Sequence, residues 1–358
     1  MDLIKAFTEL LPIEAPFEID KLEKDESNQE VHIYLRVDKQ KLPPNNSLHS
    51  HYKRSWEHLK LFQYRCFIHC KLPIYKDKAT GKLWKSEVSF SRDYSRFTLL
   101  YEAEVMRLMK IHHCFSTVGK NLGIYPQRVE SIYHHYTESF EEDIITQTPV
   151  NVAYDETSSR KGHDYITSFY DLDTQQIIGI YDGKASDCVA QFMQDHPYPE
   201  ALKNISIDMS PAFISGAKGY FSQANVTFDK WHVIKLIYKH LEALGTKADP
   251  FNDYISLLMN QVTSFYKQNM YQEFAAQLQF IADFAQDICM DNPITKTIMS
   301  HFDGIANYAN SKITNAVMEG INSKIQVIKR VARGFRYKRN FKKMIRFVFA
   351  NLDFQVIS

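Results

Sequence analysis

Three acidic residues have positions in this sequence that suit metal-assisted phosphoryl transfer. Asp155 and Asp208 each end an apolar run with strand character, and Glu319 lies in a segment with helical spacing. Because α/β sheets bind ligands at the carboxyl ends of their strands, neighbouring strands would bring the two aspartates together, and the helix would supply a third carboxylate. Carboxylates without His or Cys partners suit Mg²⁺ or Mn²⁺, and two such ions can assist both the attacking and the leaving oxygen. The alternative is that both aspartates are ordinary turn residues.

A fourth candidate lies where the next strand gives way to a helix, in the sequence Asp229-Lys230-Trp231-His232. Asp229 is predicted to cap the helix, and His232 could approach the acids as a proton carrier or an orienting donor.

The helix that carries Glu319 is predicted to have two distinct faces. Its apolar stripe consists of Val317, Ile321, Ile325, Ile328 and Ala332. Its polar stripe consists of Asn315, Glu319, Asn322 and Gln326. Glu319 is thus the one acid in a line of amides.

A strongly basic stretch follows Glu319. Between Ser323 and Arg346 there are ten Lys or Arg residues and no Asp or Glu, although the whole chain has a net charge of only +1. The residues predicted to contact DNA here are Lys324, Lys329, Arg330, Arg333, Arg336, Lys338 and Arg339. Interleaved aromatic residues strengthen the prediction of a basic helix that binds a phosphate backbone, whereas an ordinary solvated face usually mixes both signs.

The elements that must position these residues follow a strand-rich order. Strands are predicted at 151–156, 163–173, 175–183, 203–209 and 225–229, and helices at 186–196, 211–221 and 230–244. This order predicts an α/β mixed sheet. Residues 250–305 have helical patterns and are interpreted as an insertion before the Glu319 helix.

The N-terminal part has a different texture. We expect a short helix at 2–11, an acidic linker to residue 25, and strands at 30–37 and 64–75 with a turn around Pro43. Cys66 and Cys70 would share one face of the second strand, and no second Cys pair exists, so no zinc is expected.

Residues 97–138 favour a helix-turn-helix. A glycine turn at Gly123 precedes a helix that would begin near Pro126 and present Gln127, Arg128 and Glu130, and Arg128 is the predicted DNA contact.

Composition excludes several classes of protein. The five cysteines are scattered and odd in number, which argues against a disulfide framework. No run of about 18 apolar residues occurs and the N-terminus lacks the pattern of a signal peptide, so we expect a soluble cytoplasmic protein without membrane contact.

Four blocks of this sequence resemble the DDE transposases of bacterial insertion sequences, specifically the ISL3 family. They are YDETSSRKGHDYITSFYDLD (154–173), ISIDMSPAFISG (205–216), VTFDKWHVIKL (226–236) and TNAVMEGINSKIQVIKRVARGFRYKRNF (314–341). In the family pattern, the two aspartates of the motif match Asp155 and Asp208 and the glutamate matches Glu319. The family's Asp-x-x-His signature matches Asp229 and His232.

The resemblance implies a ribonuclease-H-like core, interrupted by a helical insertion, that binds two Mg²⁺ or Mn²⁺ ions. It also implies nicking of DNA at transposon ends, followed by attack of the freed 3′-hydroxyl on target DNA. The terminal inverted repeats would be read by the N-terminal part, and by analogy a homo-oligomer would act on paired ends near the nucleoid.

One departure from the family pattern concerns zinc. Relatives have a zinc ribbon with cysteine pairs in two turns, which here read Leu42-Pro43-Pro44-Asn45-Asn46 and Lys76-Asp77-Lys78-Ala79-Thr80-Gly81. We therefore expect a metal-free β unit.

The predicted fold class is a multidomain α+β protein. The expected parts are a small β unit (1–95), a helix-turn-helix region (96–148), the first part of the core (149–245), a helical insertion (246–310) and a core helix with a basic tail (311–358). Two other functions remain open. The chain could be a ribonuclease-H-like nuclease or junction resolvase that does not join strands, or a catalytically silent DNA-binding protein derived from a transposase.

Overall fold

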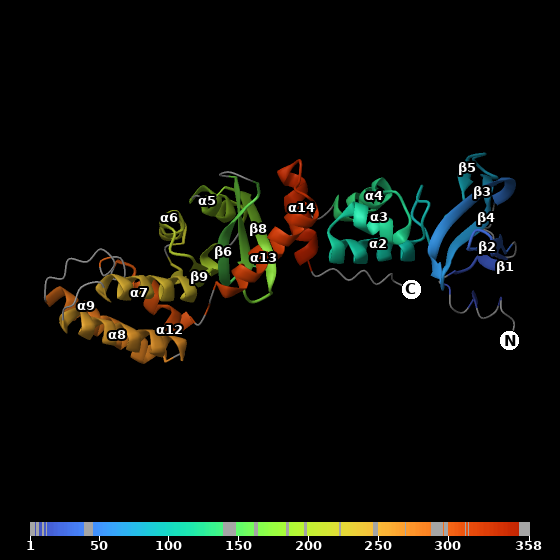
Figure 1. Ribbon diagram of the computed structural model, residues 1–358. Helices are drawn as coiled ribbons and strands as arrows, with labels where there is room; N and C mark the ends of the chain where they lie inside the picture. Colours follow the sequence, from blue (N-terminus) through green and yellow to red (C-terminus); the bar gives the residue numbers. More distant parts are fainter. Residues whose placement is uncertain are drawn as a thin grey trace. The chain divides into compact units, whose positions relative to one another are not determined.

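The computed structural model describes residues 13–38, 46–138, 148–160, 164–183, 186–196, 199–221, 223–245, 250–268, 270–287, 300–311 and 315–350, with residues 4, 7, 8, 11, 296 and 313. The chain divides into two compact units, with the boundary between Tyr136 and Thr137 (Figure 1). Most of the predicted helix at 2–11 and the turn at residues 43–45 lie outside the described residues.

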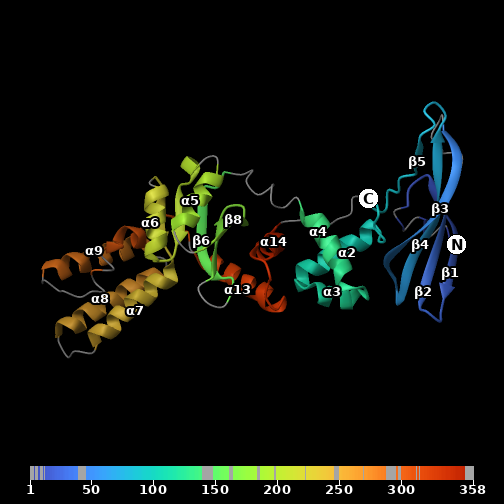
Figure 2. The same ribbon diagram turned by 90° about the horizontal axis from the view of Figure 1, so that it is seen from above.

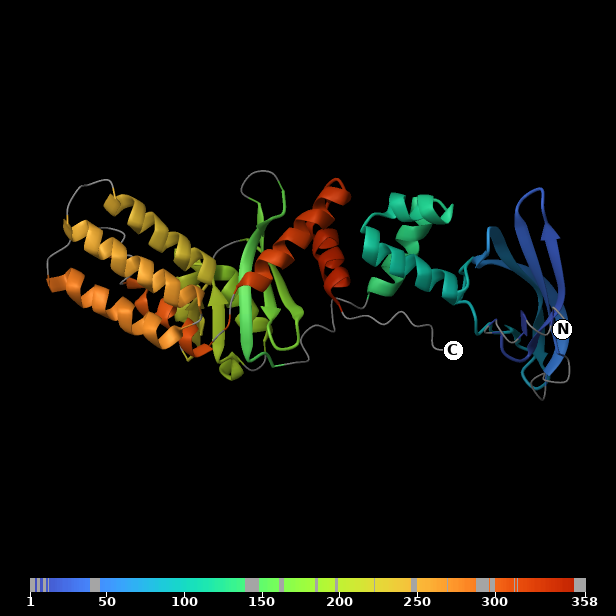
Figure 3. The ribbon, with the colours of Figure 1, turned by 60° about the horizontal axis from the view of Figure 1, so that its bottom comes forward.

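The first unit begins with a five-stranded sheet. Its strands are β1 (Phe17–Asp25), β2 (Glu30–Val37), β3 (Asn46–Leu61), β4 (Tyr64–Asp77) and β5 (Leu83–Lys85). The order is β1-β2-β4-β3 with β5 on the outer part of β4, and only β2 and β4 are parallel. Ile33, Trp56, Ile68 and Leu72 are buried on one face, and the sheet is strongly curved (Figure 3).

The sequence predicted β2 and β4 but not their outer neighbours. β1 occupies the segment expected to be an acidic linker, so that prediction was wrong. Its buried residues Phe17 and Ile19 alternate with charged ones, but a bulge after Ile19 breaks the alternation that would have revealed a strand. Cys66 and Cys70 do share the core face of β4, and burial raises the pKa of each thiol to about 12.

Three helices follow the sheet: α2 (Leu99–His112), α3 (Phe115–Leu122) and α4 (Pro126–Thr137). Gly123 ends α3 with a φ of 75°, a conformation that glycine adopts without strain. Gly119 lets the turn fold back tightly, because a Cβ there would lie 2.7 Å from the Ile124 carbonyl oxygen. The predicted glycine turn and the helix start at Pro126 are therefore confirmed.

The helices are joined to the sheet by several hydrogen bonds. The Glu57 amide on β3 donates to the Arg96 carbonyl, and the Glu57 carbonyl accepts from the Thr98 amide. The Thr98 hydroxyl caps α2 and also shares a 2.9 Å hydrogen bond with buried His58 of β3. This connection ties the start of α2 directly to the sheet.

The second unit contains a mixed sheet. Its strands are β6 (Asn151–Ser158), β7 (Tyr165–Asp171), β8 (Gln176–Asp182), β9 (Asn204–Ile207) and β10 (Asn225–Phe228). The order is β10-β9-β6-β7-β8, with β6, β9 and β10 parallel to one another and β7 antiparallel to both its neighbours. All five predicted strands are present, so the expected mixed sheet is confirmed.

Helices cover both faces of this sheet (Figure 2). Those nearest to it are α5 (Ser186–Asp195), α6 (Pro211–Tyr220), α13 (Ala316–Val331) and α14 (Lys338–Phe349). The Tyr154 hydroxyl donates to a carbonyl of α6, whereas the next residue, Asp155, faces α13. Because successive strand residues point to opposite faces, α6 and α13 lie on opposite sides of β6.

The other described α-helices of this unit lie between β10 and α13 in the sequence. They are α7 (Lys230–Gly245), α8 (Pro250–Lys267), α9 (Tyr271–Asp287), α11 (Phe302–Ala306) and α12 (Tyr308–Ser311). Buried Met259, Tyr266 and Phe274 belong to the same hydrophobic cluster as the sheet residues Tyr154 and Phe169. The helices therefore extend the core of the sheet.

Helix α11 packs closely on β10. A Cβ on Gly304 would lie 2.3 Å from the ring of Phe228, the last residue of β10. Only a residue without a side chain fits there unless the ring moves. Among the described helices, none is both long and apolar enough to cross a membrane.

Candidate active site

Three aspartates lie at the same level of the second sheet. Ala153 of β6 pairs with Ser206 of β9, and Ile207 of β9 pairs with Phe228 of β10. Continuing this parallel register puts Asp155 beside Asp208, and Asp208 beside Asp229. The sequence expectation that neighbouring strands bring acids together is met by the register, although Asp155 lies within β6, which continues to Ser158.

The electrostatics of Asp155 reflect this crowding. Burial raises its pKa to about 7; the amide of Glu156, which donates to Oδ1 at 2.8 Å, opposes that effect, and the charges of Asp208 and Asp229 add to it. A cation bound nearby would lower the pKa of this carboxyl group again, because a positive charge stabilises the ionised form.

The other two aspartates are held by backbone amides. Asp208 Oδ1 accepts a 2.7 Å hydrogen bond from the Ser210 amide at the start of α6. Asp229 is only 3% exposed, and its Oδ2 accepts from the His232 amide at 3.4 Å. Asp229 is therefore the N-cap of α7, as its position in the sequence predicted.

The polar stripe of α13 lies along β6. Asn322 Nδ2 donates to Asp155 Oδ2 at 2.8 Å, and Gln326 Nε2 donates to the Thr157 hydroxyl at 2.7 Å. The buried stripe consists of Met318, Ile321, Ile325 and Ile328, whereas Val317 is exposed, contrary to the prediction. The structure thus brings Asn322, an amide of the predicted polar stripe to which no role was assigned, onto Asp155.

Glu319 lies on the same helix, about 4.5 Å along the axis before Asn322. Its side chain is exposed and has no hydrogen bond or ion pair with any described residue. The helical spacing keeps it on the side of α13 that carries Asn322, but the structure gives it no contact with the aspartates.

His232 lines a cavity of about 390 Å³ next to Asp208. Lys235, Lys239 and His301 line the same cavity. Sequence reasoning missed these three residues. The two lysines follow His232 at helical spacing, a signal that could have been read, but His301 comes from a distant segment and only the folded chain reveals it.

The donor set can be compared with the divalent ions that the sequence implies. Asp155 and Asp208 offer carboxylate oxygens, and the buried Asn322 Oδ1 has no hydrogen-bond partner among the described residues. Oxygen donors of this kind suit Mg²⁺ or Mn²⁺. Within the described part of the chain, no three His, Cys, Asp or Glu side chains already form a metal-holding group.

We predicted that the basic stretch is one helix, and this prediction was wrong. Arg333 and Gly334 have φ values of 55° and 91°, and this turn separates α13 from α14. Lys329 donates to the Ser158 carbonyl at 2.7 Å, and Lys338 forms an ion pair with Asp164. These two predicted DNA contacts therefore have partners within the protein.

The other predicted contacts are open to solvent. Exposed cations in this region are Lys324, Arg330, Arg333, Arg336 and Arg339. Arg128 is exposed on α4 in the first unit. These six residues are available to a polyanion.

A substitution at Asn322 should reveal how strongly the acids repel one another. Asn322→Asp places a further carboxylate against Asp155, and we expect it to lower the free energy of unfolding by about 1–3 kcal/mol in EDTA. Millimolar Mg²⁺ or Mn²⁺ should restore most of that loss. Urea unfolding followed by tryptophan fluorescence measures both effects.

The matched control is Ser323→Asp, which adds the same charge on an exposed position of the same helix. Equal stability of Asn322→Asp and wild type in EDTA would contradict the proposed crowding of carboxylates.

Comparison with known proteins now identifies the class. Residues 152–249 and 256–345 match a family model described as a transposase, and together they make up more than half of the chain. Residues 86–147 match the helix-turn-helix domain of transposase family ISL3. A helix-turn-helix followed by a mixed sheet with aligned acids is thus the framework of a transposase.

The chain belongs to the ISL3 family of DDE transposases. It is also similar to the transposase for insertion sequence element IS1001 of Bordetella parapertussis, with 21% identity over 245 residues. That match covers 55% of this chain and 60% of the relative, so the chain spans less than two thirds of the length of this curated relative. The family resemblance stated from the sequence is confirmed, and so is the helix-turn-helix.

Proposed function

We propose that this protein is a transposase that cleaves and joins DNA strands at the terminal inverted repeats of an insertion sequence, with divalent metal ions as cofactors. The observation that carries the proposal is the register of the second sheet, which aligns Asp155, Asp208 and Asp229. Strand ends that converge in this way form the ligand sites of α/β sheets.

The topology supports a ribonuclease-H-like core. Three strands in hairpin succession, β6 to β8, are extended on the side of β6 by two parallel strands, β9 and β10. Helices α8 and α9 would then be the insertion, and α13 the returning helix. The domain boundaries expected from the sequence are part of this proposal.

Asp155, Asp208 and Glu319 would hold the metal ions. When bound, these ions would supply activation of the attacking hydroxyl and stabilisation of the leaving oxygen. Glu319 would complete the set by turning its exposed side chain towards the aspartates.

Neighbouring side chains would orient these ligands. Asn322 and the Glu156 amide each donate to one oxygen of Asp155 and thereby fix the plane of its carboxyl group. Asp229 caps α7 and so fixes the first turn of the helix, from which His232 reaches the cavity beside Asp208. There the His232 ring would donate to a DNA oxygen next to the metal ions.

DNA binding would be shared among several surfaces. Arg128 on α4 would contact the end sequence, and the exposed cations of α13 and α14 would contact the phosphate backbone. A homo-oligomer would bring two ends together.

The direct test is cleavage of a labelled duplex carrying the flanking ends of this gene, in Mg²⁺ or Mn²⁺ and in EDTA. Metal-dependent nicking at the end, followed by joining to a target duplex, is the expected result. Nicking without joining would instead indicate a nuclease. Tight binding without nicking would indicate a silent DNA-binding protein.

A further inference from the structure

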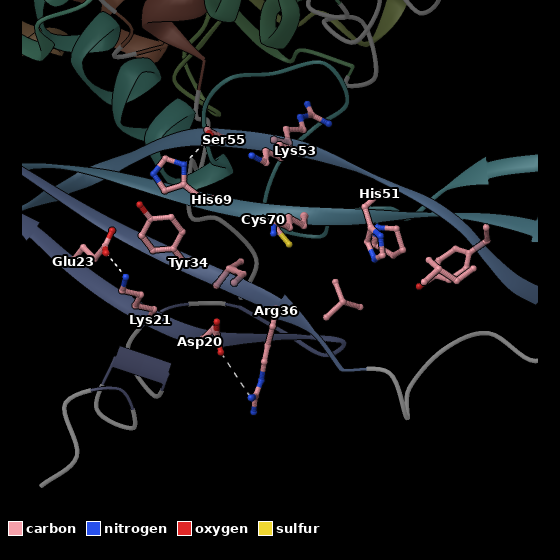
Figure 4. Close-up of a pocket in the computed structure, with 17 residues that line it drawn as sticks. Asp20, Lys21, Glu23, Tyr34, Arg36, His51, Lys53, Ser55, His69 and Cys70 are labelled. Carbon is pink, nitrogen blue, oxygen red and sulfur yellow. Dashed lines mark hydrogen bonds and ion pairs between the residues drawn. The ribbon is translucent and has the colours of Figure 1, made fainter.

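The first unit has a second candidate site, on the face of its curved sheet opposite the buried core. A cavity of about 840 Å³ lies on this open face (Figure 4). Four of the residues that line it have cationic side chains on this face, and two have acidic ones. The cations are Lys21, Arg36, Lys53 and Lys71, whereas the guanidinium of Arg54, another lining residue, lies on the core face over the Trp56 ring. An excess of positive charge in a concave surface attracts a polyanion.

Two of these cations are placed against each other. Lys53 of β3 pairs directly with Lys71 of β4, and both side chains are exposed. Neither has an ion pair with a carboxylate of the described residues, whereas Lys21 and Arg36 do. Like charges directly opposite each other destabilise a sheet. An anion bound between them would remove this cost.

Aromatic rings occupy the next row of the same face. Tyr34 of β2 and His69 of β4 are paired, and their ring centroids are 4.9 Å apart at 26°. This distance is close to the usual spacing of neighbouring strands, so the two nearly parallel rings stack across the strands. His32 and Phe67 repeat the arrangement one row further, at 5.6 Å and 18°.

The stack ends at a small residue. Ser55 of β3 lies opposite His69 and its hydroxyl meets the Nδ1 edge of the ring, so a short side chain rather than another ring lies beside His69 on this strand (Figure 4). Hydrogen bonds to the Ser55 hydroxyl (2.7 Å) and to His32 (2.9 Å) fix the ring. Burial and the neighbouring His32 lower the pKa of His69, which keeps the ring neutral.

We propose that this open face binds single-stranded DNA, with an unpaired base stacked on the Tyr34 and His69 rings beside Ser55 and the adjoining phosphates held by Lys53 and Lys71. Aromatic side chains bind single strands by stacking on their bases. The bases of a duplex are already stacked on each other, so they are not free to stack on these rings. The cations supply the charge complementarity for the backbone. We propose DNA rather than RNA as the bound strand, because the chain belongs to a transposase family.

The test compares a labelled 12-nucleotide oligo(dT) with a 12-base-pair duplex, using fluorescence anisotropy on the full chain in EDTA. Lys53→Glu is expected to weaken oligo(dT) binding about tenfold and to leave duplex binding within about twofold. It should also raise the thermal midpoint of unfolding, because it puts a carboxylate opposite Lys71. If Lys53→Glu binds oligo(dT) more weakly and yet unfolds at a higher temperature, the loss of binding cannot be caused by misfolding.

A second variant tests the base slot without changing charge. Ser55→Phe should fill the space beside His69 and weaken oligo(dT) binding by a similar factor. The matched charge control is Lys60→Glu, an exposed β3 residue outside the cavity, which should affect neither ligand.

Three outcomes would overturn the proposal. They are unchanged oligo(dT) binding by Lys53→Glu, an equal loss for oligo(dT) and duplex, and tighter binding of oligo(U) than of oligo(dT). Because EDTA prevents metal-dependent cleavage, the result does not depend on the proposed catalytic function.

Discussion

Asp208→Asn is expected to reduce metal-dependent cleavage of end DNA by at least about a thousandfold, because a neutral amide holds a divalent cation far less well than a carboxylate. Binding of the end duplex should stay within about twofold of wild type. Asp208 follows β9 directly, and its Oδ1 accepts a short backbone hydrogen bond from Ser210, which an amide oxygen can also accept. The substitution should therefore preserve the fold.

The control for this experiment is Asp187→Asn, an exposed acid in the first turn of α5 on the same unit. It should cleave at the wild-type rate. Gel-resolved nicking with and without Mn²⁺ measures cleavage, and gel shift in EDTA measures binding. Cleavage by Asp208→Asn at a rate near wild type would refute the proposed metal site.

Gly304→Ala is expected to destabilise the second unit by about 1–3 kcal/mol or more, because the new methyl group would overlap the Phe228 ring. Phe228 precedes Asp229 in the chain, so a displaced ring would also move the cap of α7 and the His232 ring. Cleavage should fall together with stability.

The same substitution elsewhere supplies the contrast. Gly320→Ala, in α13, places its methyl group in open space and should stabilise the protein by about 0.5–1 kcal/mol. Thermal unfolding distinguishes the two, since about 1 kcal/mol shifts the midpoint by roughly 2–4 °C in a unit of this size. Equal midpoints for the two variants would show that α11 does not pack on β10 as described.

The second sheet could be predicted because its strands are short apolar runs with clear ends. Asp208 and Asp229 follow such runs directly, so their meeting at one edge needed only the rule for parallel strands. The amide stripe of α13 was visible for a similar reason, since helical spacing alone puts Asn322 and Gln326 on one side.

Other features depend on contacts that spacing does not encode. Strand β1 was hidden by its charge and its bulge, and the break at Arg333 and Gly334 was hidden in a continuous basic run. Lys329 and Lys338 looked the same as their neighbours in the sequence, yet each has a partner on a distant segment. Pairwise tertiary contacts decide which cations remain free, and no local pattern records them.

The hydrogen bonds that join Glu57, His58 and Thr98 have a further consequence. They fasten α2 to β3 through both backbone and side chains, so the sheet and the start of the helices move together. A duplex read by α4 and a strand held on the open face of the sheet would then be kept at a constant separation. The first unit would therefore set the number of nucleotides between the recognised sequence and the point where the strands separate.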